Sequence, residues 1–99
     1  MSEFVVTQHN SEGRLILAVC DKEIHGRKFE SGNVVLDLGA RFYNGQEKDA
    51  AAVEKLMLQA YTIHVVGKNA VAIAIKLGLA AKEDEKTVAG VPHVQVLML

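Results

Sequence analysis

Apolar and polar positions at the beginning of the chain follow the pattern of β-strands. Residues 4–9 and 14–20 are rich in β-branched side chains and are separated by the turn-forming sequence Asn-Ser-Glu-Gly at residues 10–13. This arrangement predicts a β-hairpin. The second segment is apolar on both of its faces, so we expect a central strand that is covered on each side.

The next part of the chain predicts a loop and a third strand. Residues 22–32 are polar and rich in turn-forming side chains, so we expect an ordered loop that Ile24 and Phe29 pin to the core. Residues 33–42 alternate again and predict a strand. The Asn-Gly pair at residues 44–45 is expected to end it with a turn.

In residues 48–61 the apolar period changes to three and four, which predicts an amphipathic helix. Asp49 lies near its start, where the helix dipole favours negative charge. A second and more buried helix is predicted over residues 68–77. Gly78 is expected to end that helix in the left-handed conformation.

The end of the chain alternates once more and predicts a closing strand over residues 91–99. The elements together indicate an α+β fold. Its small, mostly antiparallel sheet is expected to contain the N-terminal hairpin, the third strand and the C-terminal strand, with two helices packed on one face. A chain of 99 residues has the usual length of one domain, so we expect residues 1–99 to form a single domain.

Composition narrows the possible environments and partners. The chain is 49% hydrophobic and 23% charged, as is common for globular proteins, and its formal net charge is −1. Nucleic-acid binding would therefore need a local basic patch. A single cysteine fits a reducing cytoplasm. Residues 1–4 lack a secretory signal pattern, and the polar side chains within residues 60–77 exclude a membrane span, so no membrane association is expected.

Cys20 and Asp21 are adjacent residues with side chains that can take part in catalysis. Neighbouring side chains of a strand point to opposite faces, so they cannot act as a pair while the strand continues. The apolar run before Cys20 predicts a buried core thiol with a raised pKa. Asp21 is expected to accept backbone N–H groups in the turn after the strand, and the alternative is a catalytic carboxylate.

His93 and Gln95 form a polar pair on the closing strand, where their spacing places them on one face. The simpler interpretation puts both on the solvent side of an edge strand. The alternative is a binding or catalytic role, in which His93 is the acid or base and Gln95 orients it or the substrate. The Val91–Pro92 bond is a candidate for the cis form.

The sequence offers no recognisable metal or cofactor motif. Its four histidines lack the close spacing of a metal site, and no CxxC or HExxH pattern occurs, so neither a metal nor a cofactor is expected. Gly67 and Lys68 open the second helix, where free N–H groups and an ammonium group can hold an anion. No phosphate-loop pattern surrounds them, which favours a plain helix start.

Basic and aromatic residues mark candidate nucleic-acid contacts. Arg27 and Lys28 lie in the polar loop, and the aromatic pair Phe42-Tyr43 lies close to Arg41 near the end of the third strand. An aromatic ring beside a cation can stack on unpaired bases, as in RNA-binding proteins. The alternative is a hydrophobic plug at a strand end.

Four short stretches of the chain carry a family resemblance. They are Ala18-Val19-Cys20-Asp21 with Gly26, Phe42-Tyr43-Asn44-Gly45, Val66-Gly67, and Gly90-Val91-Pro92-His93 with Gln95. These stretches resemble an uncharacterised archaeal family, the domain of unknown function DUF424. The resemblance covers nearly the whole chain and implies an archaeal cytosolic protein without an established activity. The chain departs from the family pattern at His64, where asparagine is usual, so no histidine-dependent role is implied there.

Two hypotheses of function follow from these observations. The leading one is a small cytoplasmic binding module for RNA or for a ribonucleoprotein or other protein complex, with basic and aromatic side chains near the ends of its sheet. The alternative is a small enzyme or ligand-binding domain in which His93, Gln95 and Asp21 converge in one pocket.

A third possibility is structural. The closing strand is apolar, and as an edge strand it would invite pairing with a second copy of the chain. Leu97 and Leu99 would then lie on the same face as His93 and Gln95.

Overall fold

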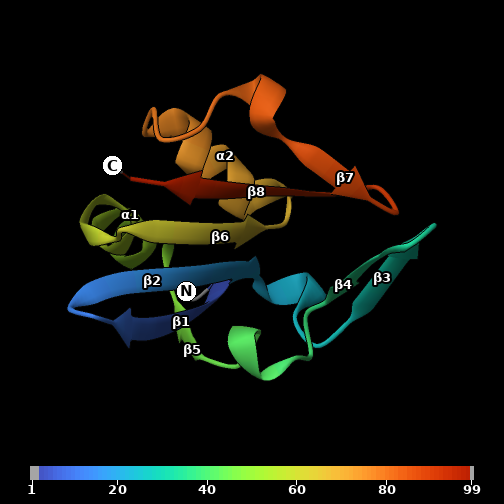
Figure 1. The fold of residues 1–99 in the computed structure, drawn as a ribbon, viewed down its shortest axis with the longest axis horizontal. Coiled ribbons are helices and arrows are strands. Elements are labelled where there is room, and N and C mark those ends of the chain that lie inside the picture. Colours follow the sequence, from blue (N-terminus) through green and yellow to red (C-terminus); the bar gives the residue numbers. More distant parts are fainter. Residues whose placement is uncertain (1–2, 99) are drawn as a thin grey trace.

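The computed structural model describes residues 3–98 and contains a six-stranded sheet with two helices on one face (Figure 1). The strand order is β5-β1-β2-β6-β8-β7. The strands are β1 (Phe4–Ser11), β2 (Arg14–Asp21), β5 (Gln46–Lys48), β6 (Thr62–Val66), β7 (Lys86–Val88) and β8 (Val91–Leu97). Among these strands of the described part of the chain, only β2 and β6 are parallel neighbours. The predicted α+β class with a mostly antiparallel sheet is confirmed.

The N-terminal hairpin is confirmed, and each of its strands extends past the predicted end. β2 is a central strand, because it pairs with β1 on one side and with β6 on the other. Its last five residues, from Leu17 to Asp21, are all buried. This agrees with the prediction that the apolar strand is covered on both faces.

β6 is a central strand of the sheet that the alternation pattern did not predict. It lies between the two helices in the sequence and between β2 and β8 in space (Figure 1). Four of its five residues are β-branched, which is the composition of a buried strand. The segment is too short and too apolar for its pattern to show a period, so its sequence alone does not predict a strand.

Both helices agree closely with their predicted positions. α1 (Ala50–Gln59) begins at Asp49, whose Oδ1 accepts the Ala52 N–H at 2.9 Å. α2 (Lys68–Lys76) is followed by Gly78 in the left-handed conformation at φ 76°. The Leu79 N–H then donates back to the Ala74 carbonyl at 3.0 Å, as in a helix that ends on glycine.

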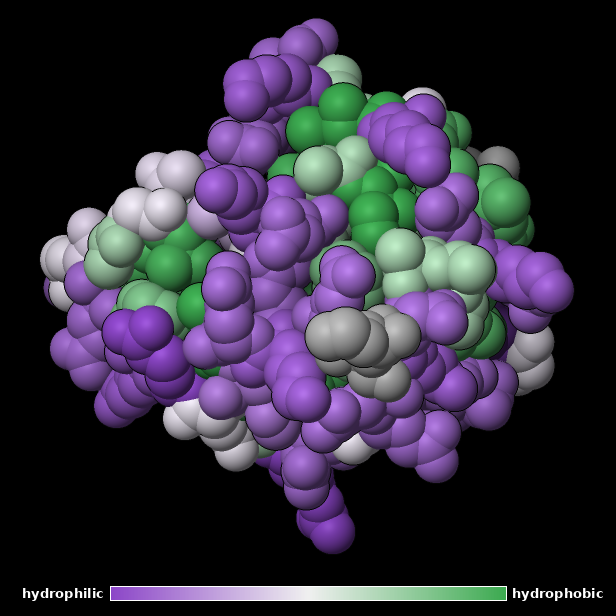
Figure 2. Space-filling model, turned by 180° about the vertical axis from the view of Figure 1, so that it is seen from behind, coloured by the Kyte–Doolittle hydropathy of each residue, from purple (hydrophilic) through white to green (hydrophobic). Residues whose placement is uncertain are grey.

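The main hydrophobic core fills the space between the helices and the sheet. Its buried members come from alternate positions of the strands and from the inner faces of both helices: Phe4, Val6, Leu17, Val19, Val53, Met57, Ala60, Ile63, Val65, Ala70, Val71, Ile73, Ala74, Val94 and Val96. Seen from the helix side, the outer surface is largely hydrophilic with separate apolar areas (Figure 2).

The predicted loop and third strand have a different structure from the one expected. Residues 22–32 contain the short 3₁₀ helix η1 (Lys22–Ile24) and the strand β3 (Lys28–Ser31). β3 pairs with β4 (Val34–Asp37) in a separate two-stranded sheet, so the third strand does not join the main sheet. Both strands are short and mostly exposed, and only Phe29 and Leu36 are partly buried.

A second 3₁₀ helix, η2 (Arg41–Tyr43), occupies the place where the third strand was expected to end. The Asn-Gly pair follows it and leads into β5, which adds to the outer edge of β1. A third 3₁₀ helix, η3 (Lys82–Asp84), precedes β7. The short strands β5 and β7 were not predicted.

The closing strand β8 is an interior strand over residues 91–93 and an edge strand over residues 94–97, which corrects the sequence interpretation in part. It pairs with β6 from Thr62 to Val66, while β7 pairs only with its first part, residues 91–93. The Val91–Pro92 bond is trans. The predicted end of this strand at Leu99 lies outside the described residues. Neither helix within residues 3–98 has the length and apolar character that crossing a membrane requires.

Candidate functional site

The face of the main sheet opposite the helices, called here the open face, is organised in three rows of side chains across the strands. The first row contains Val5, Cys20, Val66, His93 and Lys86; the second contains Thr7, Ala18, His64 and Gln95; the third contains His9, Ile16, Thr62 and Leu97. The rows follow from the strand registers, since residues paired across strands share a face.

The first row is partly covered by the β3–β4 sheet and by η2. Cys20, Val66 and Leu38 form a small second core, against which Tyr43 packs. Burial, with a smaller effect from the neighbouring Asp21, raises the pKa of the Cys20 thiol to about 12. A buried thiol at that pKa is not a nucleophile, so the prediction of a structural cysteine is confirmed.

Three rings meet over the second and third rows and are called here the ring cluster. The Phe42 ring stacks on His9 at 4.8 Å between centroids with an interplanar angle of 6°, and it meets His64 edge-on at 5.0 Å. The ring of Phe42 thus contacts side chains of both β1 and β6 and passes over β2, which lies between them. In the second row, the β2 residue between Thr7 and His64 is Ala18, whose small side chain leaves space for the ring. All three rings are partly exposed.

Two imidazoles hold η2 against the rest of the protein. The Nε2–H of His9 donates to the Phe42 carbonyl at 3.3 Å, and the Nε2–H of His25 donates to the Tyr43 carbonyl at 3.0 Å. His9 comes from the main sheet and His25 from the segment before β3. These bonds hold η2 in place and thereby position the Phe42 ring on the open face.

His64 gives the ring cluster a pH dependence. Burial, and secondarily the charge of His9, lowers the pKa of His64 from 6.5. The unfolded chain therefore binds its proton first as the pH falls, so this group lowers stability from about pH 6.5 down through the folded-state pKa. We expect His64→Asn to lose less stability on acidification across this window than the wild type, measured by urea unfolding. Equal losses in the two proteins would contradict this.

Beyond the ring cluster, the open face continues to the outer side of β8. Gln95 and Leu97 are exposed, and Leu97 retains 55% of its accessible surface. Next to them is a hollow of about 380 Å³, lined by Glu83, Asp84, Lys86, His93, Val94 and Gln95. Burial and the nearby Lys86 ammonium lower the pKa of His93. His93 and Gln95 thus share a face and a hollow.

Asp21 lies on the other side of the sheet from His93. Its carboxylate reaches the start of α2, where Oδ2 accepts the Asn69 N–H at 3.0 Å and Oδ1 accepts the Ala70 N–H at 2.7 Å. Asp21 therefore accepts backbone N–H groups of a distant helix, and not of its own turn as expected. Burial raises the pKa of this carboxyl, while the two hydrogen bonds oppose the rise.

The start of α2, considered above as an anion site, already holds an internal anion. The N–H groups that a phosphate or carboxylate would use are those that bind the Asp21 carboxylate. Gly67 is buried beneath it, and Lys68 is exposed on the outer side of the helix. This arrangement is a helix cap provided by a distant residue of the chain.

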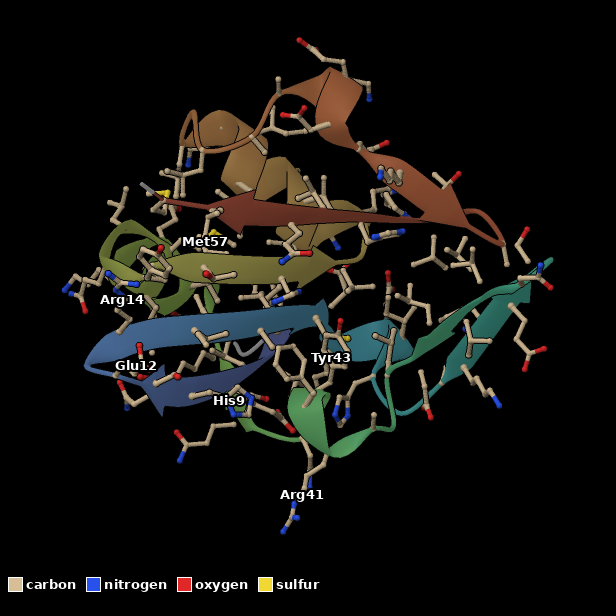
Figure 3. The ribbon with its side chains drawn as sticks, viewed as in Figure 1. His9, Glu12, Arg14, Arg41, Tyr43 and Met57 are labelled. Carbon is tan, nitrogen blue, oxygen red and sulfur yellow. The ribbon has the colours of Figure 1, made fainter. Side chains whose placement is uncertain are left out.

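The predicted basic and aromatic contacts are divided between two regions. Arg27 lies over the Phe29 ring at 5.0 Å, and Lys28 pairs with Glu30 at 3.3 Å, both in or beside the β3–β4 sheet. Tyr43 belongs to the open face, while the side chain of Arg41 points away from the sheet into solvent (Figure 3).

The structure does not bring the proposed catalytic residues together. His93 and Gln95 lie on the open face, and Asp21 lies beneath the sheet at the helix cap. Residues 3–98 also contain no group of three metal-binding side chains. The enzyme hypothesis requires the Asp21 carboxylate in the same pocket as His93. That carboxylate instead accepts hydrogen bonds from two backbone N–H groups at the start of α2.

His9 and His64 were not selected from the sequence as site residues. Phe42 was considered together with Tyr43, as an aromatic pair that stacks on bases or plugs a strand end. The signal available was the alternation itself, which puts His9 and His64 on the polar side of their strands. Their meeting over β2 depends on the register between β1, β2 and β6, which no local pattern gives.

Comparison with known proteins places the chain in a family. It matches a family model described as a protein of unknown function (DUF424) over residues 9–99. No curated protein matches it. It is similar to the crystal structure of an uncharacterized conserved protein from Methanopyrus kandleri, with a TM-score of 0.77 and 22% identity over 97% of this chain and 93% of that chain. That likeness concerns the fold alone. Because the family model covers nearly all of the sequence, the chain belongs to the DUF424 family.

Proposed function

We propose that this protein is a cytoplasmic binding module for single-stranded RNA and that the open face is its binding surface. The ring cluster is the observation on which the proposal rests. It presents three flat side chains, His9, Phe42 and His64, on the side of the sheet that carries no helix. Proteins that bind unpaired RNA on a sheet commonly stack bases on such rings.

The exposure of the three rings to solvent supports RNA binding by the open face. An aromatic plug at a strand end would be buried, whereas the three rings keep part of their surface in solvent. Stacking of a base on an aromatic side chain contributes about 1–3 kcal/mol. Next to the rings, Gln95 can hydrogen-bond base edges, and the exposed Leu97 offers apolar contact.

Cations surround the open face at three places. Arg14 stands at one end of β2, where it lies over the Tyr61 ring at 4.4 Å. Arg41 is exposed on η2, and Lys86 faces the hollow beside His93. With three phosphate contacts at about −0.7 each, a plot of log affinity against log salt should have a slope of about −2. The net charge of −1 favours moderate affinity over tight nonspecific binding.

A pair of leucines provides a matched test of which face binds. Leu97 is 55% exposed on the open face, and Leu58 is 60% exposed on α1. Leu97→Glu and Leu58→Glu change the net charge equally, but only the first places a carboxylate on the proposed RNA path. We expect Leu97→Glu to weaken binding of a fluorescent single-stranded RNA by about tenfold and Leu58→Glu to have little effect, measured by anisotropy.

Further variants test the ring cluster itself. Phe42→Leu keeps an apolar side chain but removes the ring, so it should weaken binding of single-stranded RNA by about tenfold. Binding of duplex RNA should be weak both in the wild type and in this variant. Circular dichroism would verify that each variant is folded. Equal effects of the two leucine variants, or no binding of single-stranded RNA by the wild type, would overturn the proposal.

A further inference from the structure

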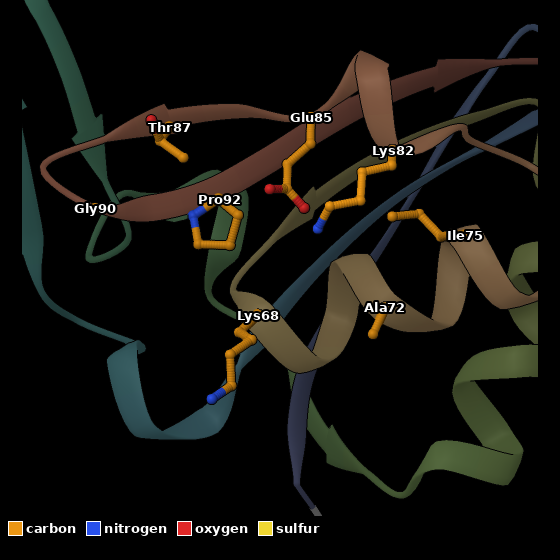
Figure 4. A pocket seen from close by; sticks show the side chains of 8 residues that line it. All are labelled: Lys68, Ala72, Ile75, Lys82, Glu85, Thr87, Gly90 and Pro92. Atoms are coloured by element: carbon orange, nitrogen blue, oxygen red, sulfur yellow. The ribbon is translucent and has the colours of Figure 1, made fainter.

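A separate cleft opens on the helix side of the molecule, between α2 and the β7–β8 hairpin (Figure 4). Its volume of about 420 Å³ lies within the range of small-molecule sites, about 300–1,000 Å³. Thr87 and Pro92 belong to the strand positions that face the helices, so the sheet separates this cleft from the open face. The cleft is therefore independent of the proposed RNA surface.

The floor of the cleft is apolar. Ala72 and Ile75 project from one side of α2, and Pro92 faces them from β8 (Figure 4). Pro92 and Ile75 are partly buried, so a ligand that covers them removes more apolar surface from water. This floor suits a short aliphatic side chain.

One positive and one negative group point into the cleft above this floor. The Lys82 ammonium and the Glu85 carboxylate both extend toward the cleft from the segment before β7, whereas the Lys68 ammonium points away from them (Figure 4). The ion pairs found within residues 3–98 join other residues: Lys22 with Glu47, Lys28 with Glu30 and Lys76 with Glu54. Lys82 and Glu85 are thus not joined in a direct ion pair, and both groups are available to a ligand.

We propose that this cleft binds a small zwitterion with an apolar body, the chemistry of an apolar α-amino acid. The ligand carboxylate pairs with Lys82, its ammonium pairs with Glu85, and its side chain packs on Ile75 and Pro92. A simple anion such as phosphate would face the Glu85 carboxylate. A purely apolar molecule would cover both charged groups without giving either of them a partner.

The first experiment titrates the protein with L-leucine and follows backbone amide signals by NMR. Saturable shifts of Ala72, Thr87 and Gly90 are expected at about millimolar concentration, as suits so small a ligand. Isocaproate lacks the ammonium of leucine and isoamylamine lacks the carboxylate, so each should bind about tenfold more weakly. Absence of saturable shifts, shifts outside the cleft, or equal binding of the three compounds would overturn the proposal.

Variants then test the two charged groups. Lys82→Gln and Glu85→Gln should each weaken leucine binding by about tenfold, whereas Lys55→Gln on the exposed side of α1 should not. The double exchange Lys82→Glu with Glu85→Lys restores one charge of each sign, and it should bind leucine more tightly than either single variant. Binding unchanged in both single variants would contradict the assignment. None of these results depends on RNA binding.

Discussion

Replacing Asp21 by alanine is expected to lower the free energy of unfolding by about 3 kcal/mol. The substitution leaves the Ala70 N–H without its acceptor at a buried position, which costs about 1–3 kcal/mol, and it removes the acceptor of the part-buried Asn69 N–H at a smaller cost. It also removes a negative charge from the start of α2, where the helix dipole favours it. Urea unfolding followed by circular dichroism measures the change.

Asp49 provides the matched control for this prediction. It caps α1 through one hydrogen bond to Ala52 at an exposed position, so Asp49→Ala should cost only about 1 kcal/mol. Asp21→Asn keeps one acceptor oxygen and should fall between the wild type and Asp21→Ala, which keeps the comparison measurable if the alanine variant does not fold. Equal destabilisation by Asp21→Ala and Asp49→Ala would show that burial and the second bond contribute nothing.

Replacing Gly67 by alanine should destabilise the protein by about 3 kcal/mol through two effects. Gly67 has φ 109° and ψ 151°, a conformation nearly confined to glycine, and forcing alanine into it costs about 1–3 kcal/mol. A methyl group there would also meet the Asp21 carboxyl, with Oδ2 only 2.6 Å away. The glycine is therefore what allows the carboxylate to approach the helix. Thermal and urea unfolding of the variant test this.

Gly78 separates these two effects. Its φ of 76° is also left-handed, but an added methyl group would meet nothing within 4 Å, so Gly78→Ala should cost only about 1 kcal/mol. The clash with Asp21 can be removed by combining Gly67→Ala with Asp21→Ala. The double variant should then lose less stability than the sum of the single variants. Strict additivity would argue against contact between the two positions.

The open face and the cleft divide the protein into two independent surfaces. The ring cluster belongs to the side without helices, and the cleft belongs to the side that carries α2. The helix cap at Asp21 and Gly67 couples the end of β2 to the start of α2 beneath the sheet. Variants of this cap should therefore be used to study stability, and variants of the exposed leucines to study binding.

Several local features were determined by the sequence. The two helices and the closing strand are each specified by a repeating pattern within one segment. The hairpin of β1 and β2 is specified by β-branched composition on both sides of a turn-forming sequence. Asp49 and Gly78 mark helix ends through contacts with residues only a few positions away. The burial of Cys20 follows from the apolar run that contains it.

Tertiary structure decided how these elements meet. β6 is a short apolar segment without a readable period, and it separates β8 from β2. On the other side of β8, the short strand β7 covers residues 91–93, so that part of the expected edge strand is interior. The predicted third strand, β4, does not belong to the main sheet because it pairs with β3, which forms in the preceding segment. Pairing between strands depends on the whole sheet, so a local pattern does not give it.

The same reason explains which contacts of the site residues could not be predicted from the sequence. Asp21 binds N–H groups 48 and 49 positions further along the chain, and the Phe42 ring bridges His9 and His64 across a strand. Alternation places a side chain on one face or the other, but register decides what stands beside it. The sequence alone therefore determined the hairpin, the two helices and the closing strand β8 with its polar face, whereas the separation of Asp21 from His93 and the assembly of the ring cluster required the folded sheet.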